Sequence, residues 1–357
     1  MSNARSSDKK LVRSTLVDHV HVSHTLPAVF VLGVVDTAVA LGASRTSLLA
    51  ASGLAPSQLS TPEAPVPVNA IFATWEAAMR ALHDPAFPIA YAKRFLVESY
   101  PVLGFAVMTA PTGREVFARV LRFSSIVTTS GRLRTREEGN RLVVGWERHS
   151  ARTLGHRVAN EAVLAEVMTA LRQTLGRDVR AEGVRFRHAA PSRTREHEAF
   201  FGARLSWEAP ENALVLPRDV LDAVPRLANV AMAAYFEKEA ASRLREIRTA
   251  ESFSQTVARL VDASLVDGEP PLERIARQLG KSERTVRREL SAEGTGFRSI
   301  VDNVRRARAD VLLADMSVSL AEVAFALGFS EHAAFSRAYK RWTGTSPVDA
   351  RRLRGQT

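Results

Sequence analysis

The stretch Leu272-Glu273-Arg274-Ile275-Ala276-Arg277-Gln278-Leu279-Gly280 returns 48 positions later as Leu320-Ala321-Glu322-Val323-Ala324-Phe325-Ala326-Leu327-Gly328. In both copies apolar residues fall at positions i, i+3, i+4 and i+7, which line one face of a short helix. The closing glycine is typical of a helix C-terminus, where a left-handed backbone conformation is favoured. Ser282 and Ser330 follow two residues later, and each can cap a further helix by accepting backbone N–H groups. The sequence therefore predicts two helix-turn-helix motifs.

The second helix of the first motif has an apolar inner face and a basic outer face. Val286 and Leu290 are spaced to face inward. The outward positions that we expect to contact DNA bases are Arg284, Arg287 and Arg288. Arginine suits this task because its planar guanidinium can donate two hydrogen bonds to guanine O6 and N7, or bind backbone phosphates.

The second helix of the second motif, from His332 to Trp342, has a different outer face. Its inner stripe consists of three aromatic residues, Phe335, Tyr339 and Trp342. The outward positions expected to contact bases are His332, Ala333, Ala334 and Arg337. Alanine can at most touch a thymine methyl group. One apolar octet before a glycine is common in all kinds of protein, whereas two copies joined by a helix are typical of DNA-binding domains.

Several further pieces of sequence accompany the two motifs. They are Gly294-Thr295-Gly296-Phe297, Arg305-x-x-x-Ala309-x-x-Leu312-Leu313, Ala334 to Gly344, and Thr345-Ser346-Pro347. With the motifs, they resemble the AraC/XylS transcription regulators from about Thr256 to Arg354. One departure is Ala350, where the family usually has tyrosine.

The resemblance implies seven helices in two subdomains, with recognition helices in successive major grooves on one face of double-stranded DNA. By position, it assigns base contacts to the seven outward residues named above. Phosphate contacts are expected from hydroxyl and basic side chains that flank them, namely Ser282, Arg305, Arg306, Ser336, Lys340 and Arg341.

Composition agrees with this assignment. The 357 residues are enough for two ordinary domains, 46% of them are hydrophobic, and 49 basic against 38 acidic residues give a net charge of +11, which favours polyanions. The chain has no cysteine, which excludes disulfides, thiolate metal sites and cysteine nucleophiles, and with them the alkyl-accepting DNA-repair relatives of the family. This composition suits the reducing cytoplasm, where we expect the protein to act.

No targeting or membrane segment is recognisable. The most apolar stretch, Pro27 to Leu41, is 15 residues long and contains Asp36, whereas a membrane span needs about 20 apolar residues. It is expected to be a buried helix. Residues 1–20 are expected to be disordered.

Residues 21–220 are expected to form an α+β domain, followed by a helical connector over 221–252 and an all-α DNA-binding domain over 253–357. Helical patterns dominate from Leu26 to Val127, interrupted by a surface loop at Ser57 to Pro67, and Ala159 to Leu175 is a further amphipathic helix. Strands are predicted at Leu142–Trp146, Gly183–His188, Leu205–Glu208 and Ala213–Leu216, the last two as a hairpin.

This first domain also resembles a family, the effector-sensing "arabinose-binding" domain of one branch of the same regulators. The pieces that carry the resemblance are Ser47 to Leu54, His83 to Pro88, Val184-x-Phe186-x-His188-x-x-Pro191, and Phe200-Phe201-Gly202 followed by Leu205. The resemblance implies ligand sensing, dimerisation and no catalysis. The sugar itself does not transfer, because members sense diverse molecules.

In the connector, Leu227, Val230, Ala231 and Ala234 can form one apolar stripe. Two alternatives remain open for it. Either the helix packs on its own domain, or it forms a dimer contact that passes the state of the sensor to the DNA-binding half.

Other candidate sites are weaker. His19, His21 and His24 have only Asp18 as a neighbouring carboxylate, so a solvated segment explains them better than a metal site. His188 shares the parity of Val184 and Phe186 and is expected to point inward, as a core histidine or as a polar group of a pocket. No Gly-x-Ser-x-Gly elbow or phosphate-binding loop is present. We therefore expect no catalytic, cofactor or metal site.

Two hypotheses follow. The favoured one is a ligand-responsive, sequence-specific transcription regulator whose partners are double-stranded DNA, a small-molecule effector, RNA polymerase and a second copy of the chain. The alternative is an N-terminal enzyme for small molecules that is tethered to DNA.

Overall fold

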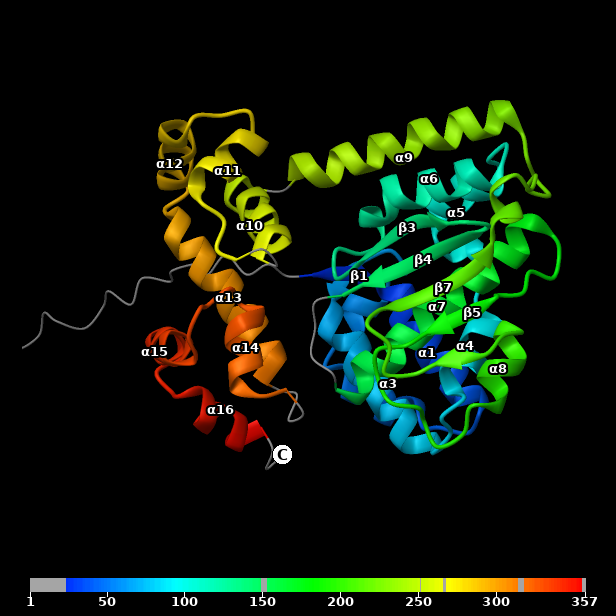
Figure 1. Cartoon of the computed structure of the whole chain (residues 1–357), viewed down its shortest axis with the longest axis horizontal. Helices are drawn as coiled ribbons and strands as arrows, with labels where there is room; N and C mark the ends of the chain where they lie inside the picture. The colour runs from blue at the N-terminus through cyan, green and yellow to red at the C-terminus, as the bar shows by residue number, and fades with distance from the viewer. Residues whose placement is uncertain (1–23, 149–152, 251, 266–267, 314–317, 355–357) are drawn as a thin grey trace, which may run out of the picture.

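The structure is a computed structural model that describes residues 24–148, 153–250, 252–265, 268–313 and 318–354. The expectations for residues 1–20, and for His19 and His21, lie outside this range. Figure 1 shows two bodies, an α+β body and an all-helical body, connected by one long helix. The predicted fold class is thus confirmed.

The α+β body begins with helices. Its first elements are β1 (Thr25–Pro27), α1 (Ala28–Ala40), α2 (Arg45–Ser52), η1 (Pro56–Leu59), β2 (Pro65–Pro67), α3 (Val68–Leu82), α4 (Phe87–Arg94), η2 (Val97–Ser99), α5 (Pro101–Met108), α6 (Gly113–Phe123) and η3 (Ser124–Ile126). The apolar stretch at residue 27 is indeed a buried helix, since Val31, Val34, Val35 and Ala38 in α1 have no exposed surface. The expected loop over 57–67 contains part of η1 and the strand β2, which pairs antiparallel with β1.

The second half of this body carries the sheet. Its elements are β3 (Arg132–Glu138), β4 (Arg141–Glu147), α7 (Leu154–Leu175), β5 (Gly183–Arg185), α8 (Arg195–Phe201), β6 (Leu205–Ser206), β7 (Asn212–Pro217) and η4 (Arg218–Leu221). The sheet order is β3-β4-β7-β5-β6, antiparallel except for the β5–β6 pair. The helix predicted from Ala159 is confirmed and begins five residues earlier, at Leu154.

The predicted hairpin between the last two strands is wrong. β6 pairs in parallel with β5, and β7 lies between β4 and β5. The physical reason is the burial of β7, whose residues 212–216 are all buried. A buried strand needs hydrogen-bond partners along both edges, which a two-residue neighbour on one side does not supply.

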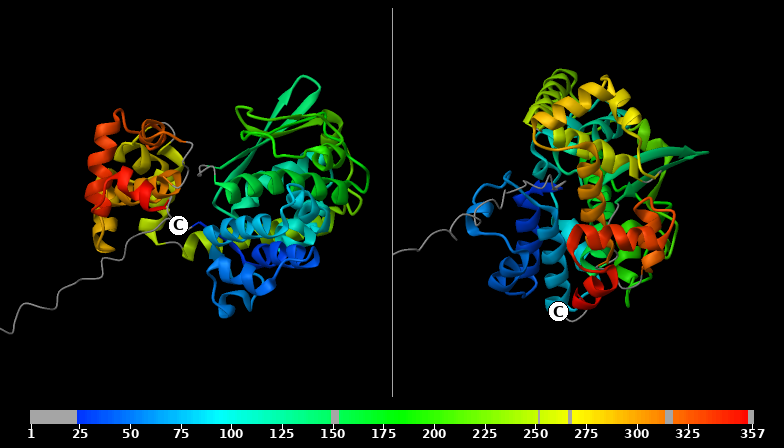
Figure 2. Two further views of the ribbon diagram at one scale, coloured as in Figure 1. Left: turned by 90° about the horizontal axis from the view of Figure 1, so that it is seen from below. Right: turned by 90° about the vertical axis from the view of Figure 1, so that its left-hand side faces the viewer.

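The two faces of the sheet differ. On the inner face, alternate residues of β4 (Leu142, Val144 and Trp146) pack in one cluster with Leu164 and Met168 of α7. The strands, the central helices and the first helices form successive layers, seen from below in Figure 2.

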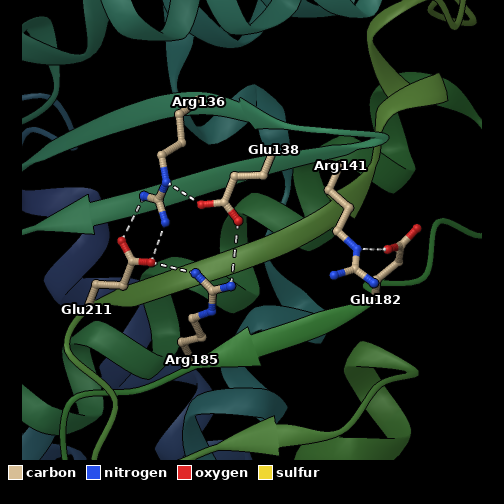
Figure 3. Close-up of polar contacts among 6 residues, drawn as sticks. All are labelled: Arg136, Glu138, Arg141, Glu182, Arg185 and Glu211. Atoms are coloured by element: carbon tan, nitrogen blue, oxygen red, sulfur yellow. Dashed lines mark hydrogen bonds and ion pairs between the residues drawn. The ribbon is translucent and has the colours of Figure 1, made fainter.

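On the outer face, a small buried patch lies beneath a network of ion pairs (Figure 3). Glu211 accepts hydrogen bonds from Arg136 at 2.8 and 2.6 Å and from Arg185 at 2.7 Å. Arg141 pairs with Glu182 at 2.7 Å. These side chains are partly exposed to water, so each pair adds little to stability.

The connecting helix α9 (Val230–Ala250) packs on the α+β body through Ala240 and Leu244, which share a cluster with residues of α5 and α6. Glu237 pairs with Arg119 and Arg122 at 3.2 and 2.7 Å. The first alternative for this segment, packing on its own domain, therefore describes this face of α9. The apolar stripe predicted from Leu227 lies on the exposed side instead, since Val230 is 79% exposed.

The second body is helical throughout its described residues. It contains α10 (Phe253–Ser264), α11 (Leu272–Gln278), α12 (Glu283–Ala292), α13 (Phe297–Leu313), α14 (Leu320–Ala326), α15 (His332–Thr343) and α16 (Pro347–Arg354). Two separate clusters of buried residues, one on each half of α13, form its cores. The seven helices and two subdomains implied by the resemblance are confirmed.

Across the described residues, no helix combines the length and the apolar character that a membrane span requires. Nor, within those ranges, do three or more histidine, aspartate or glutamate side chains gather in an arrangement that could hold a metal ion.

Candidate DNA-binding surface and ligand cavity

The first helix-turn-helix motif has the expected local geometry. Gly280 adopts a left-handed backbone conformation with φ of 64° after α11. The Ser282 side chain then caps α12 by accepting a hydrogen bond from the Thr285 backbone N–H at 3.1 Å. Val286 and Leu290 are fully buried against α11, so the opposite face of α12 is turned outward.

The second motif differs at its turn. Gly328 is again left-handed, with φ of 73°. The expected cap Ser330 is wrong, because α15 begins at His332 and its N-cap residue is Glu331, which makes no capping hydrogen bond with its side chain. Instead α14 is capped, since Ser319 and Glu322 exchange hydrogen bonds at 3.2 and 2.7 Å.

A tyrosine fixes α15 on the domain. The Tyr339 hydroxyl is buried and donates a hydrogen bond to Asp310 of α13 at 2.7 Å. Phe335 packs in the same cluster, with its ring centroid 5.8 Å from that of Tyr339. The inner face of α15 is therefore the predicted aromatic stripe.

The expected base-contacting arginines of α12 are exposed. Arg287 forms an ion pair with Glu283 at 3.1 Å, a surface pair of small energy. Arg284 and Arg288 have no ion-pair partner among the described residues. Two exposed cations without a counter-charge, on a capped helix, suit a polyanion.

On α15, His332, Ala333 and Arg337 are exposed, and Ala334 is half-buried. His332 Nε2 lies 3.4 Å from the Ser336 hydroxyl. Figure 1 shows α12 and α15 on the side of the helical body that faces away from the α+β body, with α13 running between them. The two outer faces are thus available on the same side of the domain.

The residues expected to bind phosphate fall into two groups. Lys340 is exposed, Arg306 is half-buried, and Arg341 forms a surface ion pair with Asp302 at 3.3 Å. Ser282 and Ser336 lie at the beginning of α12 and on α15. All five lie on or beside the elements that present the outer faces.

Arg305 is the exception, and the expected phosphate contact is wrong for this residue. Its side chain is buried, and its guanidinium donates to the carbonyl oxygens of Leu327 and Gly328 at 3.0 and 3.2 Å and to Glu269 at 2.6 Å. It also lies over the ring of Phe329, 4.4 Å from the centroid. Arg305 therefore ties α13 to the turn of the second motif instead of facing DNA.

In the α+β body, His188 points inward as predicted and belongs to the core. Its Nε2 lies 3.2 Å from Glu161, and Nε2 of His197 lies 2.9 Å from the other carboxylate oxygen. All three side chains are buried. Burial lowers the pKa of His188, although the nearby charge of Glu161 raises it. The core-histidine alternative is the one observed.

The α+β body contains an apolar cavity that sequence analysis did not locate. Its volume is about 170 Å³, and it lies between the inner face of β3–β4 and helices α3, α5, α6 and α7. Its walls are mainly aliphatic and aromatic, with Trp75, Leu103, Leu133, Val144 and Trp146 among them. Such a space is typical of a site for a small apolar molecule.

One end of the cavity is polar. Tyr100 donates a hydrogen bond to Glu166 at 2.8 Å. Burial raises the pKa of Glu166 to about 7, although hydrogen bonds from Tyr100 and Tyr91 and the nearby charge of Arg148 lower it. A carboxyl group with this pKa is partly protonated at neutral pH.

Arg148 lies in the wall at the same end. Its guanidinium carbon lies 5.0 and 5.1 Å from the ring centroids of Phe72 and Trp146, and Nη1 donates to Asn160 at 3.3 Å. Nε is buried and has no hydrogen-bond partner in the described ranges. Burial lowers the pKa of Arg148 to about 10, so the group stays charged at neutral pH.

Comparison with known proteins supports this description. The family model described as the arabinose-binding N-terminal domain of AraC transcription regulators matches residues 42–224, and a helix-turn-helix domain model matches residues 275–353. The chain belongs to the AraC family of transcription regulators.

Several curated regulators resemble this AraC-family chain. The ornithine utilization regulator of Pseudomonas aeruginosa is 26% identical over 91% of this chain and 96% of its own. The regulator VqsM of the same organism is 34% identical over 43% of this chain and 48% of its own. VirS of Mycobacterium tuberculosis is 36% identical over 29% and 31%.

Among solved structures, the transcriptional regulator CdpR of Pseudomonas aeruginosa is 24% identical, with a TM-score of 0.43 over 86% of this chain and 96% of that one. The names of the three curated relatives describe regulators. This AraC-family protein is accordingly a DNA-binding transcription regulator with an N-terminal ligand-binding domain.

The polar residues of the cavity come from distant parts of this AraC-family chain. Tyr100, Arg148 and Glu166 lie before α5, after β4 and on α7. One signal was present in the sequence. Arg148 continues the alternation of Leu142, Val144 and Trp146, which places it on the inner face of the sheet.

Proposed function

We propose that this AraC-family regulator recognises its operator by placing α12 and α15 in two adjacent major grooves. The observation that carries the proposal is the pair of outer faces on one side of the helical body, one of them with exposed, unpaired arginines. The residues proposed to contact bases are Arg284, Arg287, Arg288, His332, Ala333, Ala334 and Arg337.

Phosphate contacts would fix the position of the two helices on the duplex. We assign them to Ser282, Arg306, Ser336, Lys340 and Arg341, and we leave out Arg305 because its donors are used inside the domain. The exposed pair between Arg341 and Asp302 can open at little cost when a phosphate competes.

The cavity is the proposed effector site, and α9 is the proposed route to the DNA-binding half. Leu103 and Val107 of α5 line the cavity and share a cluster with Ala240 and Leu244 of α9. An effector can act only by binding one state of the protein more tightly than the other. A shift of α5 on binding would be transmitted to α9, which leads into α10.

We further propose that the exposed side of α9 pairs with a second copy of the chain. Val230, Met232 and Tyr235 are 79%, 48% and 58% exposed there, and a helix that joins the two bodies is well placed for an effector-sensitive dimer contact. Val230→Glu should break this contact and so lower the molar mass of the assembly that light scattering measures.

RNA polymerase is the proposed further partner, and the cytoplasm is the proposed location, because transcription takes place there.

The proposal is tested by selecting preferred sequences from random duplex DNA with the full chain. Arg287→Ala should relax the base preference at one position and weaken binding by about 1–3 kcal/mol if the guanidinium makes a bidentate contact. The matched control is Arg195→Ala, which removes an exposed arginine of α8, outside both α9 and the proposed surface.

Unchanged preferences in the Arg287 variant would remove this residue from the assigned contacts. A wild-type protein without any sequence preference would contradict the proposal as a whole. The tethered-enzyme alternative predicts instead that a molecule bound in the cavity is chemically converted, which mass spectrometry of the incubated ligand would detect.

A further inference from the structure

We propose that the cavity of the α+β body binds an apolar monocarboxylate whose carboxylate is held by the guanidinium of Arg148. This inference rests on the proposed function, in which the cavity is the effector site, and it names the chemical class of the effector.

The walls set the body of the ligand. They are mostly aliphatic and aromatic, and the volume is about 170 Å³. A protein cavity of about 150 Å³ is large enough for benzene and stays dry when its lining is apolar. The body of the ligand is therefore a single ring or a short alkyl chain.

Arg148 sets the head group. A guanidinium has five N–H donors, and among the described residues only the Asn160 side chain accepts from this one, at 3.3 Å. Its Nε is buried and has no hydrogen-bond partner within the part of the chain that the structure describes, which is costly unless a further acceptor arrives. A carboxylate supplies two oxygens in the geometry that matches the fork of a guanidinium, together with the missing negative charge.

Glu166 supplies only part of that charge, because its nearby carboxyl group is partly protonated. No ion pair joins it to Arg148 among the described residues, and burial keeps the carboxyl partly protonated at neutral pH, with a pKa of about 7. The polar end of the cavity thus carries a cation and a carboxyl group that is easily neutralised. A neutral Glu166 would not repel an incoming carboxylate.

A cationic ligand fits less well. An amine would approach the guanidinium with a like charge and leave its donors unpaired. Ornithine, the compound in the name of one relative, carries two amino groups and one carboxylate, and mostly apolar walls are a costly surrounding for two further charges. We therefore expect this chain to bind a different molecule from the one in that name.

The test uses three probes that share a hexyl chain or its six-carbon length and differ in the head group: hexanoate, 1-hexanol and hexylamine. Calorimetric titration of the full chain at neutral pH should show hexanoate binding at least about tenfold more tightly than 1-hexanol, because the charge-assisted hydrogen bonds form only with the acid. Hexylamine should bind more weakly than either.

Three variants localise the effect. Arg148→Met should lower the affinity for hexanoate to that for 1-hexanol, while 1-hexanol itself binds as before and so reports that the cavity is intact. Arg148→Lys should keep part of the preference for the acid. Arg134→Gln, which removes an exposed arginine of β3 outside the cavity, should change neither affinity.

The proposal is overturned if 1-hexanol or hexylamine binds as tightly as hexanoate, if none of the three binds, or if Arg148→Met leaves the preference for the acid unchanged. Duplex selection with the same samples separates this result from the proposed function. Sequence preference without a preference for the acid would reject the head group and retain the regulator, whereas loss of both would reject both.

Discussion

The outer face of α12 and the contact between α13 and the second helix-turn-helix motif both depend on arginine, but under opposite conditions. Arg284 and Arg288 are exposed and lack an ion-pair partner among the described residues. Arg305, on the following helix α13, is buried and donates hydrogen bonds to Leu327, Gly328 and Glu269. Exposure leaves the first two cations free for DNA, whereas the third has become part of the scaffold that spaces the two motifs.

The largest effect is expected on the scaffold side of this comparison. Arg305→Ala leaves the buried carbonyl oxygen of Leu327 and the partly buried one of Gly328 without this donor and removes the packing on Phe329. We expect it to lower the free energy of unfolding by about 2–4 kcal/mol, measured by chemical denaturation. Arg306→Ala, at the half-buried neighbouring position, is the control and should change it by less than about 1 kcal/mol. Equal losses in both variants would mean that the buried contacts of Arg305 contribute no more to stability than an ordinary side chain of α13.

A buried ionisable group in the α+β body extends the comparison to pH. The pKa of Glu166 is raised from 4.5 to about 7 in the folded protein, so the folded state holds the proton more tightly than the unfolded chain. Stability from this group is present below pH 4.5 and is lost as the pH rises through about 7. Glu166→Gln should therefore gain stability relative to wild type over this window, by up to about 3 kcal/mol. Denaturation at a series of pH values checks this, and a constant difference would contradict it.

The exposed arginines should affect binding and leave folding unchanged. Arg284→Ala is expected to weaken operator binding by about 1–3 kcal/mol with an unchanged melting temperature. Anisotropy titrations at several salt concentrations would measure it. A loss of thermal stability that matches the loss of binding would show that Arg284, like Arg305, stabilises the fold.

The smallest effect should come from the outer face of α15, which carries alanines, whereas the outer face of α12 carries arginines. Ala333→Ser removes at most one methyl–methyl contact and should cost about 0.8 kcal/mol or less. It should relax a preference for thymine at one position, read from the selected sequences. A cost as large as that of Arg284→Ala would contradict the view that α12 provides most of the specificity.

Sequence patterns were enough for the features that depend on local periodicity. The repeated apolar spacing gave both motifs, and the aromatic stripe of α15 was correctly oriented because Phe335 and Tyr339 lie one helical turn apart. Charge and spacing could not separate Arg305 from Arg306, because the acceptors of Arg305 are backbone carbonyls more than twenty residues further along.

The α+β body was harder to predict for similar reasons. β3 was missed because, of its seven residues, six are polar or charged and Leu133 alone is apolar. The hairpin was wrong because adjacency in sequence says nothing about which buried edge a strand such as β7 must fill. The cavity is formed by segments from residue 26 to residue 174, so only the fold brings its walls together.

The most direct measurement is the spacing of preferred bases in duplexes selected by the wild-type chain. If a rigid α13, locked by Arg305, holds two helices for adjacent grooves, the selected sequences should contain two clusters of preferred bases with centres about 10 base pairs apart. A single cluster, or two clusters whose spacing varies from one selected sequence to another, would contradict the account.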